Sequence, residues 1–404
     1  MHCKSLRFDL VCVWVRIVAC FRSRRSEAAG RRFEFSLPGS RRRGPEFRFL
    51  YLAWVFSLAI SGIALQGCKR IVSNKPIGKP VAIAAPLGLP PVPIPANNPA
   101  TADAIALGRK LFYDSRLSNQ GTLSCASCHI PGHDFSDPHN VSLGFGGARG
   151  ARNAPSVVNA AYLPSQFWDG RASTLEEQML GPVADPVEMD NTAQGVVTNL
   201  EKETQYPPLF RKVFGTPDIT INRVENAVAS YERTLLSGDS AFDRYEYGGD
   251  EKALTAQQIR GLAIFRDSQR GNCAVCHTIS AHYALFTDGK FHNIGEGVDD
   301  DGKFDDVGRM DQSHMVADTG AFETPTLRDI AETGPYMHNG RLKTLDEVVQ
   351  YYAGQGNSNP YLDKEMKKIH LTAQDRSDLV AFLDSLTGTT ANHAKPAAEK
   401  AAHP

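Results

Sequence analysis

Two cysteine pairs, each followed directly by a histidine, are the residues best suited to do chemistry in this chain. The first reads CASCH at residues 125–129 and the second reads CAVCH at residues 273–277. The C-x-x-C-H pattern attaches c-type haem, because two thiols on one helical turn bond the haem vinyl groups and the adjacent histidine reaches the iron. A redox dithiol and half of a zinc site are the alternatives. Neither stretch has the second Cys/His pair nearby that a zinc site would need.

The sequence therefore predicts two covalently bound c-type haems. Their rings would be held by four thiols, those of Cys125, Cys128, Cys273 and Cys276. The proximal iron ligands would be His129 and His277.

The sequence around each haem motif is duplicated, which predicts two structural copies. The pattern G-x-x-[LI]-F-x-D precedes the haem motifs at residues 108–114 and 261–267. A second frame, G-R-x-x-T-L-[D/E]-E, recurs at an offset of 170 residues and follows Trp168 in one copy and His338 in the other. Amphipathic spacing predicts further helices at 222–237, 255–266, 344–353 and 372–387. We expect a mainly all-α fold of two cytochrome c-like domains, residues 101–250 and 251–390.

The two copies differ near the end of the helix that this frame begins. Tyr352 lies there in the second copy, and the equivalent residue in the first copy is Pro182. A tyrosine can bind iron, whereas proline has no donor atom, so the second haem can be closed by a sixth ligand while the first keeps an open position. Rival sixth ligands for the second haem are Met310, Met315, Met337 and His338.

An open haem that activates peroxide needs a group that moves a proton between the peroxide oxygens. Glu188 follows Pro182 and is flanked by Val187 and Met189, so we expect its pKa to be raised. Gln178 precedes Pro182 by four residues and lies on the same helical face. Trp168 begins the first frame; its indole could pack in the core and also carry a hole between the two haems.

From about residue 100 to 390 the chain resembles the bacterial di-haem cytochrome c peroxidase/MauG family. The resemblance rests on the order and spacing of CASCH, RNAPSVVNA, QFWDGRASTLEEQ, GPVADPVEM, CAVCH, TPTLRDI and GPYMHNGRLKTLDEVV. It implies that the first haem reacts with hydrogen peroxide and the second passes electrons. It also implies that Trp168 bridges the haems and that Gln178 and Glu188 line the distal pocket. A calcium ion between the domains would be bound by Asn153, Thr333 and Pro335, the last two through backbone carbonyls.

Three positions depart from parts of this family. Ordinary peroxidases have a blocking histidine where this chain has Phe145, and a methionine ligand where it has Tyr352. Both departures resemble MauG, which oxidises tryptophans of a partner protein. MauG itself carries a surface tryptophan at the position of Gly271, so that feature is missing here.

The flanks and the charge bear on location and partners. Residues 1–50 carry 12 Lys/Arg and 4 Asp/Glu, a net of +8, so the rest carries −9 of the total of −1. An acidic body argues against nucleic acid and permits docking of a basic protein. Residues 47–68 resemble an export signal ending in LQGC, which predicts a periplasmic protein that is lipid-anchored through Cys68.

The ends of the chain should lie outside the fold. Residues 1–68 form the leader. We exclude residues 1–46 from the expected fold, because we expect translation to start further downstream. Residues 69–100 are Pro-rich and predict an extended tether, and residues 391–404 predict a disordered tail.

We therefore expect a di-haem c-type peroxidase that reduces hydrogen peroxide at the open first haem. Electrons would come through the second haem from a small c-type cytochrome or another donor, and the enzyme could be a homodimer. The alternative is a MauG-like oxidase that uses a high-valent di-haem state to modify side chains of a partner protein. A plain di-haem electron carrier is disfavoured, because a carrier gains nothing from an open iron.

Overall fold

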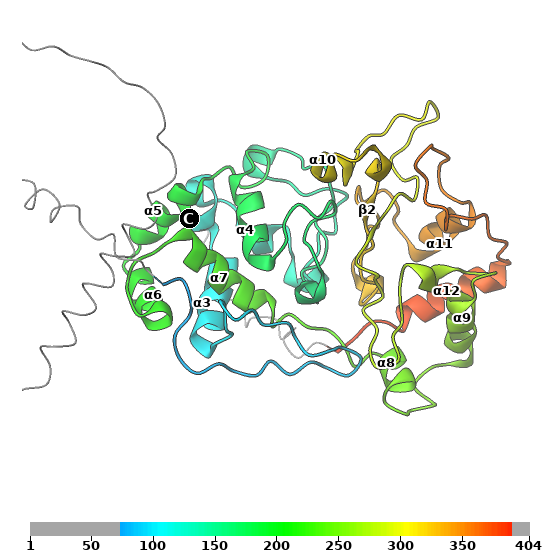
Figure 1. Ribbon diagram of the computed structural model, residues 1–404, viewed down its shortest axis with the longest axis horizontal. Helices are drawn as coiled ribbons and strands as arrows, with labels where there is room; N and C mark the ends of the chain where they lie inside the picture. Colours follow the sequence, from blue (N-terminus) through cyan, green and yellow to red (C-terminus); the bar gives the residue numbers. More distant parts are fainter. Residues whose placement is uncertain (1–72, 390–404) are drawn as a thin grey trace, which may run out of the picture. The chain divides into compact units, whose positions relative to one another are not determined.

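The computed structural model describes residues 73–389. Within this range the regular structure is mainly helical, and one antiparallel pair, β1 (Phe291–His292) with β2 (Phe322–Glu323), supplies the only sheet (Figure 1). The expectation of a mainly all-α fold is confirmed. The export signal, Cys68 and the C-terminal tail fall outside the described residues. No helix in residues 73–389 combines the length and hydropathy that crossing a membrane requires.

The first domain has a core formed by helices on both sides of the first haem motif. These helices are α3 (Ala102–Phe112), α4 (Leu175–Ala184), α5 (Ala193–Glu201), α6 (Tyr206–Phe214) and α7 (Ile221–Glu232). A threonine hydroxyl accepts a backbone N–H at the start of four of them, at Thr101, Thr174, Thr192 and Thr220. The sequence thus marks where each of these helices begins.

The second domain repeats this arrangement around its own core. Its helices are α8 (Ala241–Glu246), α9 (Ala256–Arg266), α10 (Met310–Ser313), α11 (Leu345–Ala353) and α12 (Ala373–Asp384). Phe242 of α8 is fully buried in this core, so α8 packs with the second domain although it precedes residue 250.

Repeated glycines explain why equivalent helices pack in equivalent ways. A Cβ atom on Gly108 of α3 would lie 1.8 Å from the carbonyl oxygen of Ala227 in α7. A Cβ atom on Gly261 of α9 would lie 2.0 Å from the carbonyl oxygen of Asp378 in α12. Both glycines are the first residue of the duplicated G-x-x-[LI]-F-x-D pattern. The glycine of this pattern therefore lets two helices cross at close range.

The predicted helices are present, and two are shorter than expected: the helix predicted over 372–387 is α12, which ends at Asp384. The helix predicted over 222–237 is α7 and ends at Glu232. Beyond it the backbone pairs with Asn159, which donates its N–H to Leu235 O at 2.9 Å and accepts the Ser237 N–H at 3.0 Å. This tertiary pairing takes the place of further helical turns.

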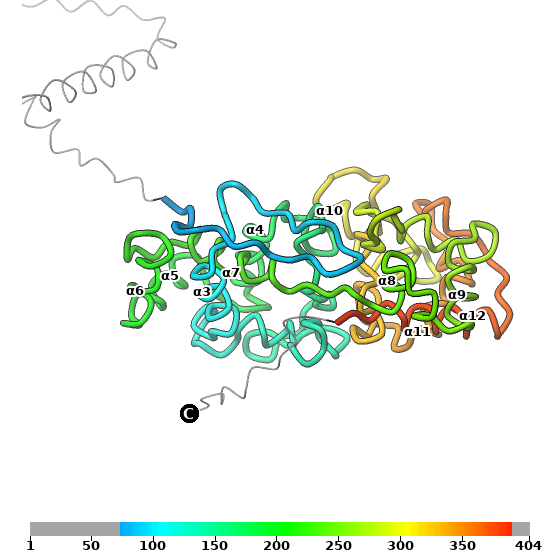
Figure 2. Tube along the Cα trace, turned by 90° about the horizontal axis from the view of Figure 1, so that it is seen from below, coloured from blue at the N-terminus to red at the C-terminus, as the bar shows by residue number. Residues whose placement is uncertain are grey.

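The Pro-rich segment 73–100 is extended, but it is not a free tether. Figure 2 shows it, in blue, running from the first-domain helices to beside α8 and back. Its backbone is fixed at both domains: Ile77 N–H donates to Val213 O at 2.7 Å, and Gly88 O accepts from Ala284 N–H at 3.1 Å. The tether prediction is wrong for the described residues, because composition alone does not reveal these long-range backbone bonds.

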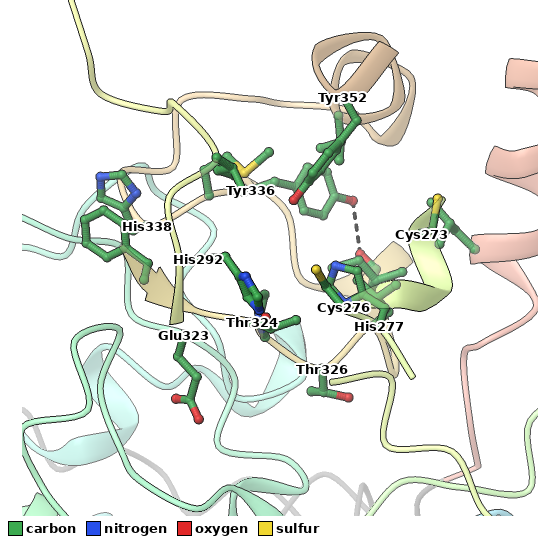
Figure 3. A pocket seen from close by; sticks show the side chains of 18 of the residues that line it. Cys273, Cys276, His277, His292, Glu323, Thr324, Thr326, Tyr336, His338 and Tyr352 are labelled. Atoms are coloured by element: carbon green, nitrogen blue, oxygen red, sulfur yellow. Dashed lines mark hydrogen bonds between the residues drawn. The ribbon is translucent and has the colours of Figure 1, made fainter. Parts of the chain in front are cut away.

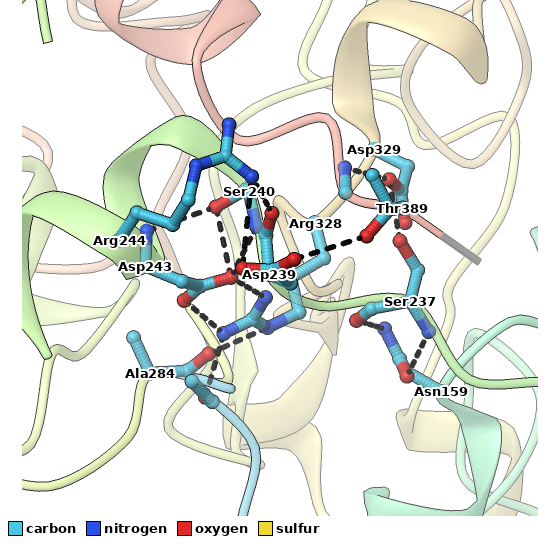
Figure 4. A network of polar contacts seen from close by, with 12 residues as sticks. Asn159, Ser237, Asp239, Ser240, Asp243, Arg244, Ala284, Arg328, Asp329 and Thr389 are labelled. Carbon is cyan, nitrogen blue, oxygen red and sulfur yellow. Dashed lines mark hydrogen bonds and ion pairs between the residues drawn. The ribbon is translucent and has the colours of Figure 1, made fainter. Parts of the chain in front are cut away.

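A buried ion pair anchors this segment to the second domain (Figure 4). The Arg328 guanidinium donates two hydrogen bonds to Asp243, both at 2.9 Å, and one to Gly88 O at 2.6 Å. The side chains of Arg328 and Asp243 are 1% and 0% exposed. A Cβ atom on Gly88 would lie 1.8 Å from Asp243 Oδ1, so only glycine lets the segment 73–100, which we call the strap, approach Asp243 this closely.

Replacing Arg328 with Met should therefore destabilise the protein by about 3–5 kcal/mol, because Asp243 would remain as a buried unpaired charge. The free energy of unfolding of the haem-loaded protein in guanidinium chloride measures this. Lys212→Met is the control: its ion pair with Asp103 is exposed, with side chains 65% and 41% accessible, and should be worth less than about 1 kcal/mol. Equal losses in the two variants would show that the buried pair is not an anchor.

Candidate di-haem active site

The first haem motif forms a tight turn that aims its histidine. Cys125–Ser127 is a 3-10 helix, and His129 N–H donates to Cys125 O at 2.9 Å. The His129 Nδ1–H points to two backbone carbonyls, Phe135 O at 3.1 Å and Pro155 O at 3.0 Å. Fixing the proton on Nδ1 leaves Nε2 with a free lone pair for iron.

The second haem motif has the same construction. Cys273–Val275 is a 3-10 helix, and the His277 Nδ1–H donates to Phe286 O at 2.9 Å. Burial lowers the pKa of both motif histidines, which favours the neutral imidazole that binds metal. None of the four motif cysteines forms a disulfide, so all four sulfur atoms can bond haem. These residues fit two c-type haems.

A cavity of about 290 Å³ lies against the second motif and is lined by Cys273, Cys276, His277 and Tyr352 (Figure 3). Burial raises the pKa of the Tyr352 phenol, and the neighbouring cysteines add to the shift. Tyr352 therefore lies in the same cavity as the second haem motif, where the duplicated frame predicts a distal ligand.

Three of the four rival ligands are poorly placed. Met315 is 59% exposed, and the Met310 sulfur accepts a hydrogen bond from Thr319. His338 lies in a stack on Phe322, with ring centroids 3.7 Å apart, and Figure 3 places it away from His277. Met337 and His338 both line the cavity, and because His338 is held in its stack on Phe322, Met337 stays the competitor of Tyr352.

The equivalent helix of the first domain supplies no donor. Helix α4 begins after Thr174 as α11 begins after Thr344, and in both helices the threonine hydroxyl accepts a hydrogen bond from the third helical residue. Pro182 lies inside the last turn of α4, at the position that Tyr352 has in α11. Gln178 is half-buried one turn earlier in α4.

Glu188 lies beside the first haem motif. Burial raises its pKa and Asp185 raises it further, while Arg171 opposes the shift. Its charge adds to the burial that raises the pKa of the Cys128 thiol. A partly buried carboxyl group beside the first haem motif, with a raised pKa, holds its proton more readily than an exposed glutamate, which suits a group that must both accept and donate a proton.

Phe145 packs on the same segment. Its N–H donates to Glu188 O at 2.7 Å, and a Cβ atom on the preceding Gly144 would lie 1.9 Å from Val187 O. The position that holds a histidine in ordinary peroxidases therefore lies beside Glu188, and here it holds a side chain without a lone pair for iron.

Trp168 connects the two domains. Its indole N–H donates to Asn153 O at 2.9 Å, and its carbonyl accepts the Glu323 N–H at 2.8 Å. It lines the same cavity as Cys276. The next residue, Asp169, is bound by Arg152 at 2.6 Å. Trp168 thus contacts residues of both domains, and its role between the haems stays a prediction.

The residues proposed for calcium also gather here. Asn153, Thr333 and Pro335 line the same cavity. The Asn153 Nδ2 group donates to Asp137 O at 3.3 Å and His139 O at 2.9 Å, which leaves Oδ1 as an acceptor. One amide oxygen with two backbone carbonyls suits a hard cation. Residues 73–389 contain no cluster of three or more His, Cys, Asp or Glu side chains for a metal.

Three charged residues near the haem sites are not among those that the sequence motifs predict. Burial raises the pKa of Glu232 to about 8, and its charge contributes to the raised pKa of the Cys125 thiol. Burial also raises the pKa of Glu323 to about 8. A contact with Cys276 and bonds to Asp363 and Asp288 raise the pKa of His292 to about 10. The available signal was a charged residue inside an apolar run, as in AVASYE and GAFETP.

These features define a di-haem cytochrome c in which equivalent helix positions hold a tyrosine in one domain and a proline in the other. The di-haem cytochrome c peroxidase family matches residues 102–252, and the cytochrome c family matches residues 258–387. The methylamine utilization protein MauG of Methylophilus methylotrophus is 39% identical over 297 residues, covering 74% of this chain and 86% of that protein.

A cytochrome-c peroxidase of Denitromonas iodatirespirans is 36% identical over 333 residues, covering 75% of this chain and 87% of its own. The crystal structure of a MauG-like protein associated with microbial copper homeostasis matches with a TM-score of 0.67 at 33% identity, covering 75% of this chain and 94% of that one. The chain belongs to the di-haem cytochrome c peroxidase/MauG family and is an oxidoreductase that carries haem. The resemblance seen in the sequence is confirmed.

If Tyr352 is the sixth ligand of the second haem, the protein should lack the near-infrared sulfur-to-iron band of His/Met coordination. A tyrosinate is a hard anionic donor and should also lower the reduction potential relative to Met. Near-infrared absorption of the oxidised protein measures the band, and Tyr352→Met should create it. Finding the band in the unmodified protein would assign Met337 instead.

Proposed function

We propose that this enzyme reduces hydrogen peroxide at the haem attached to His129, with electrons relayed through the haem attached to His277. The observation that carries this proposal is the contrast between Pro182 in α4 and Tyr352 in α11, equivalent positions in two copies of one fold. The electron donor would be a small c-type cytochrome or another reductant, and the acidic body favours a basic partner.

The bound haem would supply iron chemistry at an open coordination position. The protein would supply the protons. Hydrogen peroxide takes up two electrons and two protons and leaves as two waters. Glu188 would take a proton from the peroxide oxygen nearer the iron and deliver it to the oxygen that leaves as water, acting as base and then as acid. Gln178 would orient the peroxide by hydrogen bonding.

Modification of a partner protein is the second candidate function. Phe145 and Tyr352 favour it, because neither side chain fits the reductively activated peroxidases that the family resemblance describes. In this case, electrons would come from side chains of a bound protein through the second haem and Trp168. Turnover with peroxide and reduced cytochrome c separates the candidates, because only the peroxidase sustains steady-state oxidation of the cytochrome.

Three further features remain proposals. A calcium ion bound by Asn153, Thr333 and Pro335 would fix the junction between the domains, and metal analysis of the purified protein tests for it. Export to the periplasm and lipid attachment through Cys68 would place the enzyme at a membrane, which fractionation with and without Cys68→Ser tests. A homodimer is testable by sedimentation.

Replacing Glu188 with Gln should leave both haems attached and lower peroxide-dependent oxidation by roughly 10²-fold or more, because the amide keeps the shape and removes the proton carrier. Glu201→Gln is the matched control, since that glutamate is exposed at the end of α5. Initial rates with reduced cytochrome c measure the effect. A Glu188→Gln rate equal to that of the control would remove Glu188 from the catalytic account.

A further inference from the structure

Glu323 is a buried carboxyl group at the junction between the two haem sites. It lies on β2, is 6% exposed, and lines the cavity that also contacts Trp168 and Cys276. Its N–H bonds the Trp168 carbonyl. In Figure 3 its carboxyl group points away from His277 and Tyr352. Glu323 therefore adjoins the path between the haems without belonging to either ligand set.

The Glu323 carboxyl group is incompletely paired. Its Oε1 atom is buried and has no hydrogen-bond partner among the described residues. Burial raises its pKa to about 8, and the charge of Arg309 only partly offsets this. At neutral pH the carboxyl group is therefore mainly protonated.

The charged side chains on the elements around Glu323 have other partners. Arg309 donates to the carbonyls of Asp169 at 2.8 Å and Gly170 at 3.1 Å. The Asp169 carboxylate is bound by Arg152 and Arg171. On β1, His292 lies between Asp288 and Asp363, and the nearby Lys290 lies 3.9 Å from Asp288. The charge state of Glu323 is thus free to respond to the charge of its surroundings.

Positive charge near a buried neutral carboxyl group favours its ionisation. Removing an electron from Trp168 or from the second haem adds one positive charge to this junction. If the carboxyl group then loses its proton to water, the net charge of the junction is unchanged. In a medium of low dielectric constant, such compensation strongly favours the oxidised state.

We propose that Glu323 is the charge-compensating residue of the path between the haems, releasing its proton to solvent when the path is oxidised and regaining it on reduction. The electron goes to the peroxide at the first haem or, in a titration, to a chemical oxidant or an electrode. Glu323 would act through its charge on Trp168 and the second haem, and it would contact no substrate. This inference rests on the proposed role of Trp168 and the second haem in electron transfer.

The reduction potential of the second haem, followed spectroscopically from about pH 6 to about pH 10, tests the inference without using peroxide. In the unmodified protein the potential should fall as pH rises through the Glu323 transition, because the carboxylate stabilises the oxidised state. Glu323→Gln should lose this fall and keep a potential at or above the low-pH value. Glu225→Gln, which alters a buried glutamate of α7 with a raised pKa outside this cavity, should retain it.

The same fall in Glu323→Gln as in the unmodified protein would overturn the inference. If that variant fails to fold or bind haem, infrared difference spectra of the unmodified protein replace it: oxidation should remove a protonated carboxyl band, and its persistence would also overturn the inference. Because no peroxide is present, failure of the peroxidase proposal would leave this result interpretable, and the reverse also holds.

Discussion

Trp168 bonds to both haem domains, through its side chain and through its backbone. The bond from its indole N–H to Asn153 O ties it to the loop behind the first haem motif, and the bond from Glu323 N–H to its carbonyl ties it to β2 of the second domain. The bond from Glu323 to Trp168 joins two backbone groups, which have no side-chain rotamers to lose, and so fixes the path of the chain at the junction. Arg152, which binds both Asp169 and Asp306, adds a charged contact beside it.

Around this junction one architecture serves two chemical roles. Both copies keep the features that build the fold: a glycine at a close helix crossing, a threonine at a helix start, and a haem turn whose histidine is held by a backbone carbonyl. One difference between the copies is in the last turn of a helix, where Pro182 replaces the equivalent of Tyr352. A change confined to a ligand position alters iron chemistry without altering the packing that supports it.

The haem turns and the correspondence between α4 and α11 were predictable, because both depend on short patterns at fixed spacing. The burial of Glu323 was only hinted at by its place in the apolar run GAFETP, and its lack of a hydrogen-bond partner was not predictable, because partners come from residues far away in the chain. The strap at residues 73–100 was also hidden, since its anchors, such as Gly88 O on Arg328, join residues far apart in the chain. The end of α7 depended on Asn159 in the same way.

Electron paramagnetic resonance of the fully oxidised protein tests the central claim most directly. An open first haem and a tyrosine-closed second haem should give one high-spin and one low-spin ferric signal, because neither Pro182 nor Phe145 can bind iron. The same sample should react with peroxide without prior reduction. A spectrum with low-spin signals alone, together with inertness to peroxide until an electron is added, would contradict the account and show that another side chain, such as His133 or His139, closes the first haem.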